Sequence, residues 1–257
     1  MNKILLLLIF VPVFSLIGKA QSSKQEFDTL QFNKHLEFAN WLIEYEYYTQ
    51  LVSETIHSQS DITANEWFSY RDYRVWHTVG GNYTNNSFTI LRHVIFDSLN
   101  TISDYTGSYD TSVLEASGTA LSFANTQFQG IRDTCNLYFN SFVYRNPDKT
   151  ISIWFLPAFQ PSGQAIYGCE WEYIFDRTGK NLLRQNSYTN VITGVWIGQP
   201  RELWLNYRNT DNPTVGSVFF ALSFRDYFTR IHIDTRISTS TTTKNASGNY
   251  TWTHKMK

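Results

Sequence analysis

The 257-residue chain has few cysteines, few charged residues and almost no net charge. Its two cysteines are too few for the disulfide framework of a small secreted domain. The 21 basic and 22 acidic residues nearly cancel, so no net positive field attracts a polyanion and we expect no nucleic-acid partner. Hydrophobic residues make up 42% of the chain, which excludes an intrinsically disordered protein.

The six histidines do not occur at the spacing of metal ligands. His77 and His93 are too far apart for a local motif, as are His232 and His254, and nothing resembles H-E-x-x-H. We therefore expect no metal ion and no cofactor.

The only long apolar run is at the N-terminus. Lys3 precedes the 14 residues Ile4–Ile17, and small residues at Gly18 and Ala20 fit signal-peptidase cleavage between Ala20 and Gln21. The alternative is a retained anchor, but 14 helical residues span only about 21 Å of a hydrocarbon core about 30 Å thick.

These features predict a signal peptide at residues 1–20 and a single exported domain at residues 21–257. We expect this domain to be soluble, in the periplasm or the medium, with no integral membrane segment after cleavage.

Hydrophobic periodicity predicts helices over Asn33–His57 and Val113–Arg132, although Gly118 weakens the second. Most of the remaining chain has the pattern of strands. Turn residues at 146–149 and 176–180 indicate hairpins, and three further runs, at 202–207, 217–224 and 230–240, are also strand-like. The fold class is therefore α+β, with a long N-terminal helix followed by a mainly antiparallel sheet on which at least one further helix packs.

Cys135 and Cys169 are the only cysteines, and an oxidising compartment would allow them to pair. Closing a loop of about 35 residues would stabilise the fold by roughly 3–4 kcal/mol. The alternative is that both are reduced and buried as small hydrophobic residues.

Glu170 and Glu172 flank Trp171 in a predicted strand. They lie on one face about 7 Å apart at Cα, with Cys169, Trp171 and Tyr173 on the other face. Paired carboxylates at such separations suit a glycosidase. However, Trp171 faces away from the glutamates, so a solvated outer face opposite a buried tryptophan face is the preferred explanation.

His232 and Asp234 also share a strand face, and a histidine oriented by an aspartate is the base half of a catalytic triad. No G-x-S-x-G nucleophile motif accompanies them, so salt-bridged residues on the solvated face of a strand are the preferred interpretation.

Aromatic residues are abundant, with 8 Trp, 16 Tyr and 19 Phe. Exposed tyrosine and tryptophan are typical of contact surfaces, whereas buried ones indicate a well-packed sheet. The leading hypothesis is a non-catalytic binding module whose ligand is a glycan or an envelope protein. Its contact surface would be a patch formed by some of four tryptophans, namely Trp67, Trp76, Trp196 and Trp204. The alternative is a secreted hydrolase, in particular a glycosidase that uses Glu170 or Glu172.

Overall fold

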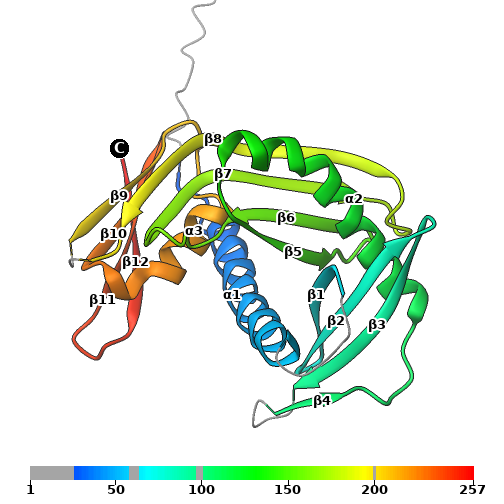
Figure 1. The fold of residues 1–257 in the computed structure, drawn as a ribbon. Helices are drawn as coiled ribbons and strands as arrows, with labels where there is room; N and C mark the ends of the chain where they lie inside the picture. Colours follow the sequence, from blue (N-terminus) through cyan, green and yellow to red (C-terminus); the bar gives the residue numbers. More distant parts are fainter. Residues whose placement is uncertain (1–25, 58–63, 97–100, 199–200) are drawn as a thin grey trace, which may run out of the picture.

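The computed structural model describes residues 26–57, 64–96, 101–198 and 201–257 (Figure 1). The expected signal peptide lies outside these residues. Within these ranges the chain forms three four-stranded sheets and three α-helices, which confirms the expected α+β class.

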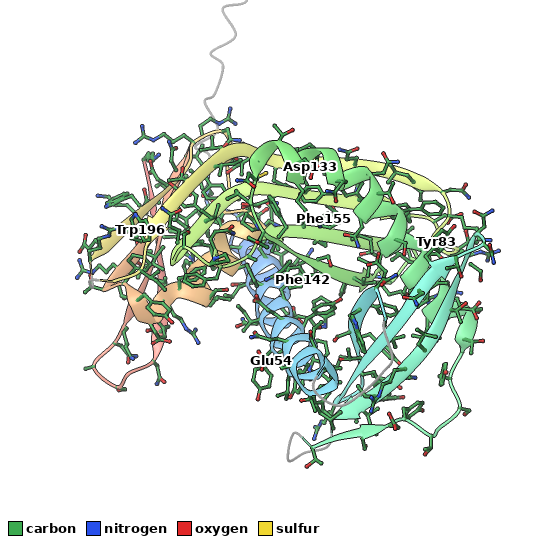
Figure 2. The ribbon with its side chains drawn as sticks, viewed as in Figure 1. Glu54, Tyr83, Asp133, Phe142, Phe155 and Trp196 are labelled. Atoms are coloured by element: carbon green, nitrogen blue, oxygen red, sulfur yellow. The ribbon has the colours of Figure 1, made fainter. Side chains whose placement is uncertain are left out.

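The central sheet has the strand order β5-β6-β7-β8 and is antiparallel throughout. Its members are β5 (Phe139–Arg145), β6 (Ile151–Pro157), β7 (Gln164–Phe175) and β8 (Leu182–Trp196). The helix α2 (Thr111–Cys135) covers one face, where Phe128 stacks on Phe155 with ring centroids 4.1 Å apart. The helices α1 (Thr29–His57) and α3 (Val215–Phe224) cover the other face, where Phe142 packs against Tyr45 and Phe219. Figure 2 shows Phe155 on the α2 side and Phe142 toward α1.

The other two sheets flank the central one. The first is antiparallel and contains β1 (Glu66–Asp72), β2 (Val75–Thr84), β3 (Ser87–Phe96) and β4 (Ile102–Asp104). The second has the order β12-β11-β10-β9, and its β9 and β10 are parallel. Its members are β9 (Glu202–Tyr207), β10 (Arg230–Thr235), β11 (Ser238–Lys244) and β12 (Tyr250–Met256), and a 3-10 turn, η1 (Arg225–Tyr227), precedes β10.

Local sequence explains why α2 is longer than expected. Asp110 caps its N-terminus by accepting a hydrogen bond from the Ser112 amide, and Asn136 ends it in the left-handed conformation with φ 50°. Gly118 is buried within it against the Phe88 ring, and a Cβ atom there would lie 2.4 Å from that ring. The glycine therefore permits close packing between α2 and β3.

Two predictions of local structure were wrong. The run expected as a strand at 217–224 belongs to α3, which Thr214 caps by accepting a hydrogen bond from the Ser217 amide. Residues 215–222 are all buried, and periodicity alone does not separate a fully buried helix from a buried strand. The second is a turn that the sequence predicts at Gly80-Gly81-Asn82, between strands at 70–79 and 87–96. Gly80 and Gly81 instead lie inside β2, where the Trp67 and Phe88 rings occupy the space that larger side chains would need.

Within the described ranges, no helix is both long and apolar enough to cross a membrane.

Candidate functional site

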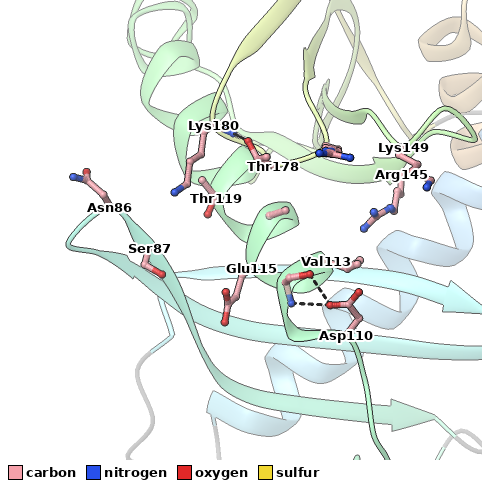
Figure 3. A pocket seen from close by; sticks show the side chains of 13 residues that line it. Asn86, Ser87, Asp110, Val113, Glu115, Thr119, Arg145, Lys149, Thr178 and Lys180 are labelled. Carbon is pink, nitrogen blue, oxygen red and sulfur yellow. Dashed lines mark hydrogen bonds between the residues drawn. The ribbon is translucent and has the colours of Figure 1, made fainter.

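A hollow of about 430 Å³ lies at the N-terminal end of α2 (Figure 3). The β2–β3 turn, the first turns of α2 and the two hairpin turns of the central sheet enclose it. This volume is within the range of small-ligand sites. We call it the basic groove, and its lining residues are Asn86, Ser87, Asp110, Ser112, Val113, Glu115, Ala116, Thr119, Arg145, Lys149, Arg177, Thr178 and Lys180.

The two hairpin turns contain the same Asp-basic-Thr sequence, with the same hydrogen bonds between aspartate and threonine. In the first turn, the Asp148 carboxylate accepts hydrogen bonds from the amide (3.0 Å) and the hydroxyl (2.6 Å) of Thr150. In the second, the Asp176 carboxylate accepts the equivalent bonds from Thr178, at 3.1 and 2.8 Å. The residue between aspartate and threonine is basic in both turns, and both basic residues line the groove. They occupy different turn positions, because Lys149 has the left-handed backbone (φ 70°) that Gly179, not Arg177, has in the second turn.

Gly179 fixes the second turn against α2. Its φ is +71°, and a Cβ atom there would lie 2.0 Å from the carbonyl oxygen of Ala116. The turn backbone therefore lies directly on α2, which places Arg177 and Lys180 beside the start of the helix.

Four basic side chains line the groove, and all four are exposed: Arg145, Lys149, Arg177 and Lys180. In the part of the chain that the structure describes, none of them forms an ion pair, whereas seven other Arg and Lys residues do. Two acidic residues, Asp110 and Glu115, also line the groove, so its formal charge is +2.

Asp110, which lines the groove, and Asp148, the neighbour of Lys149, already bind hydroxyl and amide groups. Asp110 accepts hydrogen bonds from the Ser112 amide (3.0 Å) and hydroxyl (2.6 Å), drawn as dashed lines in Figure 3. The side-chain bond from Ser112 holds the pKa of Asp110 below its ordinary value. The side-chain bond from Thr150 lowers the pKa of Asp148 in the same way. These aspartates stay ionised at neutral pH, and their oxygen atoms accept hydrogen bonds from hydroxyls and amides. Arg145 also attracts Asp110 electrostatically, without forming an ion pair at contact distance.

The groove can therefore hold an anion. Guanidinium groups recognise carboxylate, sulfate or phosphate through paired hydrogen bonds, and lysine supplies a point charge. Asn86, Ser87 and Thr119 add amide and hydroxyl groups for a polar ligand. None of the described lining residues is aromatic.

The structure places both predicted carboxylates on the face of β7 that α1 and α3 cover. Glu170 is 1% exposed and accepts hydrogen bonds from the Tyr207 hydroxyl (2.6 Å), the Thr214 hydroxyl (3.0 Å) and the Gly216 amide (3.2 Å). Burial raises the pKa of Glu170 to about 7. The cavity that it lines measures about 10 Å³, which is room for at most one water molecule.

Glu172 is also buried, and three side chains donate hydrogen bonds to it: Ser152 (2.9 Å), Asn186 (2.8 Å) and Tyr188 (2.8 Å). The interpretation of this face as solvated was therefore wrong, because α1 and α3 cover it. The shared face of the two glutamates is confirmed. The glycosidase role stays a prediction, with no room for a sugar in the cavity beside Glu170.

His232 and Asp234 share the expected face of β10, but the structure gives them separate partners. The His232 Nδ1 atom is 2.9 Å from the Thr241 hydroxyl, and the ring stacks on Trp204 at 4.1 Å. Asp234 pairs with Arg208 at 2.7 Å and with Lys257 at 2.8 Å. No hydrogen bond joins His232 to Asp234 among the described residues, so they do not form the base half of a triad here.

The four candidate tryptophans divide into two groups. Trp76 is 3% exposed and Trp67 packs partly buried against the core, whereas Trp196 and Trp204 are 59% and 56% exposed. Figure 2 shows Trp196 at the edge of the molecule, at the end of β8. An aromatic contact surface stays a prediction for Trp196 and Trp204 only.

The structure brings Cys135 and Cys169 together as free thiols, with their sulfur atoms 4.0 Å apart. This separation is about twice the length of a disulfide bond, so the bond stays a prediction.

Comparison with protein-family models, curated proteins and solved structures gives no match to this chain. None of the sequence patterns interpreted above predicted the basic groove. The repeated Asp-basic-Thr pattern at Asp148–Thr150 and Asp176–Thr178 was the signal that could have revealed it.

Proposed function

We propose that this protein is a non-catalytic binding protein that holds an acidic glycan in the basic groove. The observation that carries the proposal is the gathering of four basic side chains without ion-pair partners around one hollow of about 430 Å³. Cations left unpaired in a concave site favour a ligand that brings the compensating charge.

The lining supports a sugar rather than a nucleic acid. Hydroxyl and amide side chains, among them Asn86, Ser87 and Thr119, match the many hydroxyl groups of a glycan. Single-stranded nucleic acids are usually bound with aromatic side chains on which the bases stack, and the groove lining has none. The expected export of the chain would bring it into contact with such glycans.

This proposal moves the contact surface from the tryptophans to the groove. Trp76 is buried, and Trp196 and Trp204 do not line the groove. These two exposed tryptophans remain the competing location, and the experiment must separate the two.

The test is native electrophoresis of the purified protein through gels that contain a polyuronate, a sulfated glycan or a neutral glucan. The double variant Arg177→Gln/Lys180→Gln removes two groove charges. The matched control, Arg74→Gln/Lys255→Gln, removes two exposed charges outside the groove, so both variants have the same net charge.

The proposal expects an acidic glycan to retard the wild type and the control but not the groove variant. Equal retardation of the two variants would contradict it, as would retardation by the neutral glucan alone. Retardation lost only in Trp196→Ala or Trp204→Ala would restore the aromatic surface. Preferential binding of a single-stranded oligonucleotide would replace the glycan with a nucleic acid.

A further inference from the structure

Two histidines and three tyrosines form a close cluster on the first sheet. Trp76 packs against α1, so its neighbour His77 points to the opposite face of β2. There the His77 ring stacks on Tyr70 at 4.7 Å and lies 5.1 Å from the His93 ring. Tyr105 and Tyr109 pack against His93 at 4.6 and 4.7 Å, so aromatic rings cover both imidazoles.

Two possible donor atoms lie beside the Nε2 atom of His93 in this cluster. The Nδ1 atom of His77 is 2.9 Å from the Nε2 atom of His93, and that Nε2 atom is 3.1 Å from the Tyr70 hydroxyl. An imidazole nitrogen carries either one proton or one lone pair, so Nε2 has more neighbours than a single hydrogen bond satisfies. His93 is only 7% exposed, and its Nδ1 atom has no hydrogen-bond partner among the described residues. Hydrogen bonding within the protein therefore leaves the cluster only partly satisfied.

The spacing of the nitrogen atoms fits coordination to one ion. With metal–nitrogen bonds of about 2.0–2.1 Å, a 2.9 Å separation corresponds to a nitrogen–metal–nitrogen angle of about 90°. An angle near 90° is typical of the tetragonal coordination of Cu(II) or Ni(II), whereas tetrahedral zinc needs a wider separation. The Tyr70 hydroxyl lies 3.1 Å from the same Nε2 atom and would supply the third donor as a neutral phenol, because burial raises its pKa.

We propose that His77 Nδ1, His93 Nε2 and the Tyr70 hydroxyl bind a tetragonal divalent transition-metal ion, with Cu(II) as the best fit. Imidazole and phenol oxygen suit this ion, and Cu(II) binds such ligands more tightly than the other first-row divalent ions. Among the described residues no three His, Cys, Asp or Glu side chains gather around a metal position, so the third donor here is the phenol oxygen. The proposal does not depend on the function assigned to the basic groove.

The test is a titration of the purified protein with copper sulfate in the presence of glycine as a competing chelator. Electron paramagnetic resonance counts the nitrogen ligands, and proton NMR records which histidine ring signals the paramagnetic ion broadens. The variants are Tyr70→Phe and the double variant His77→Gln/His93→Gln. His254→Gln is the matched control, because this histidine lies in another sheet, where it contacts Ser240.

We expect one Cu(II) per chain, two coupled nitrogen atoms and selective broadening of the His77 and His93 ring signals. The double histidine variant should lose affinity at least about 100-fold and Tyr70→Phe about 10-fold, while His254→Gln binds as the wild type does. Absence of stoichiometric binding by the wild type would overturn the proposal. Broadening of other histidines, or unchanged affinity in the double variant, would also overturn it. The wild-type spectra decide the question even if the double variant does not fold.

Discussion

The substitution Glu170→Gln should flatten the dependence of stability on pH. Glu170 lies under α3, where a Cβ atom at Gly216 would come within 2.3 Å of its carboxyl carbon, so solvent has almost no access. Burial raises its pKa from 4.5 to about 7 in the folded protein, although three hydrogen bonds to the carboxylate oppose the shift.

The sign follows from proton binding. Between about pH 4.5 and pH 7 the folded chain retains a proton on Glu170 that the unfolded chain releases. The contribution of this group to the free energy of unfolding is fully present below pH 4.5 and is lost as the pH rises through 7. A pKa difference of about 2.5 corresponds to about 3 kcal/mol, with a slope of at most about 1.4 kcal/mol per pH unit.

The assay is urea denaturation of wild type and Glu170→Gln at several pH values from 4.5 to 8. Glutamine has one acceptor oxygen where glutamate has two. The variant therefore loses either the hydrogen bond from the Gly216 amide or those from the Tyr207 and Thr214 hydroxyls, and this cost does not depend on pH. The test therefore uses the change of the stability difference with pH. Other titrating groups, including His77 and His93, contribute equally to both proteins and cancel.

We expect the variant to gain about 3 kcal/mol relative to wild type between pH 4.5 and pH 8. The control Glu54→Gln, which removes an exposed carboxylate on α1, should show no comparable change. A difference between wild type and Glu170→Gln that stays constant over this pH range would refute the reasoning.

Two further predictions concern the surroundings of α2. Oxidation should join Cys135 to Cys169 and stabilise the fold by roughly 3–4 kcal/mol. If both thiols still react with a thiol reagent after oxidation and unfolding, the disulfide has not formed and the prediction is wrong. Gly179→Ala should destabilise the protein by at least about 1 kcal/mol more than Gly248→Ala, because both positions have positive φ but only the Gly179 side chain would strike the Ala116 carbonyl oxygen. Equal midpoints of urea denaturation for the two variants would show that the turn does not lie directly on α2.

Local signals were sufficient to predict much of the fold. Two signals depend only on residues close together in the sequence, so they can be recognised without the structure. They are the apolar stripe of α1 and the turn residues at 146–149 and 176–180. The helix α3 was missed because every residue from 215 to 222 is buried, which removes the alternation between polar and apolar faces. Contacts with α1 and β7, rather than a periodic pattern in its own residues, identify this segment as a buried helix.

The candidate sites depend on contacts between distant segments, which spacing along the chain does not reveal. His77 and His93 are 16 residues apart and meet because β2 and β3 pair in a particular register. Arg145 and Lys180 belong to different hairpins, and each alone has the pattern of a solvated turn residue. The net charge near zero led us to expect no polyanionic partner. The net charge is a sum over the whole chain, so it conceals a local cluster of cations without ion-pair partners.

The most direct test of the account is NMR mapping of an acidic ligand on the protein. Isotope-labelled protein would be titrated with an oligogalacturonate, and the amide shifts would be compared with those caused by a neutral maltooligosaccharide. The account predicts saturable shifts, specific to the acidic sugar, at the two hairpin turns (residues 145–150 and 176–181) and at the first turns of α2. Shifts centred on Trp196 and Trp204, or no saturable shifts with the acidic sugar, would contradict it.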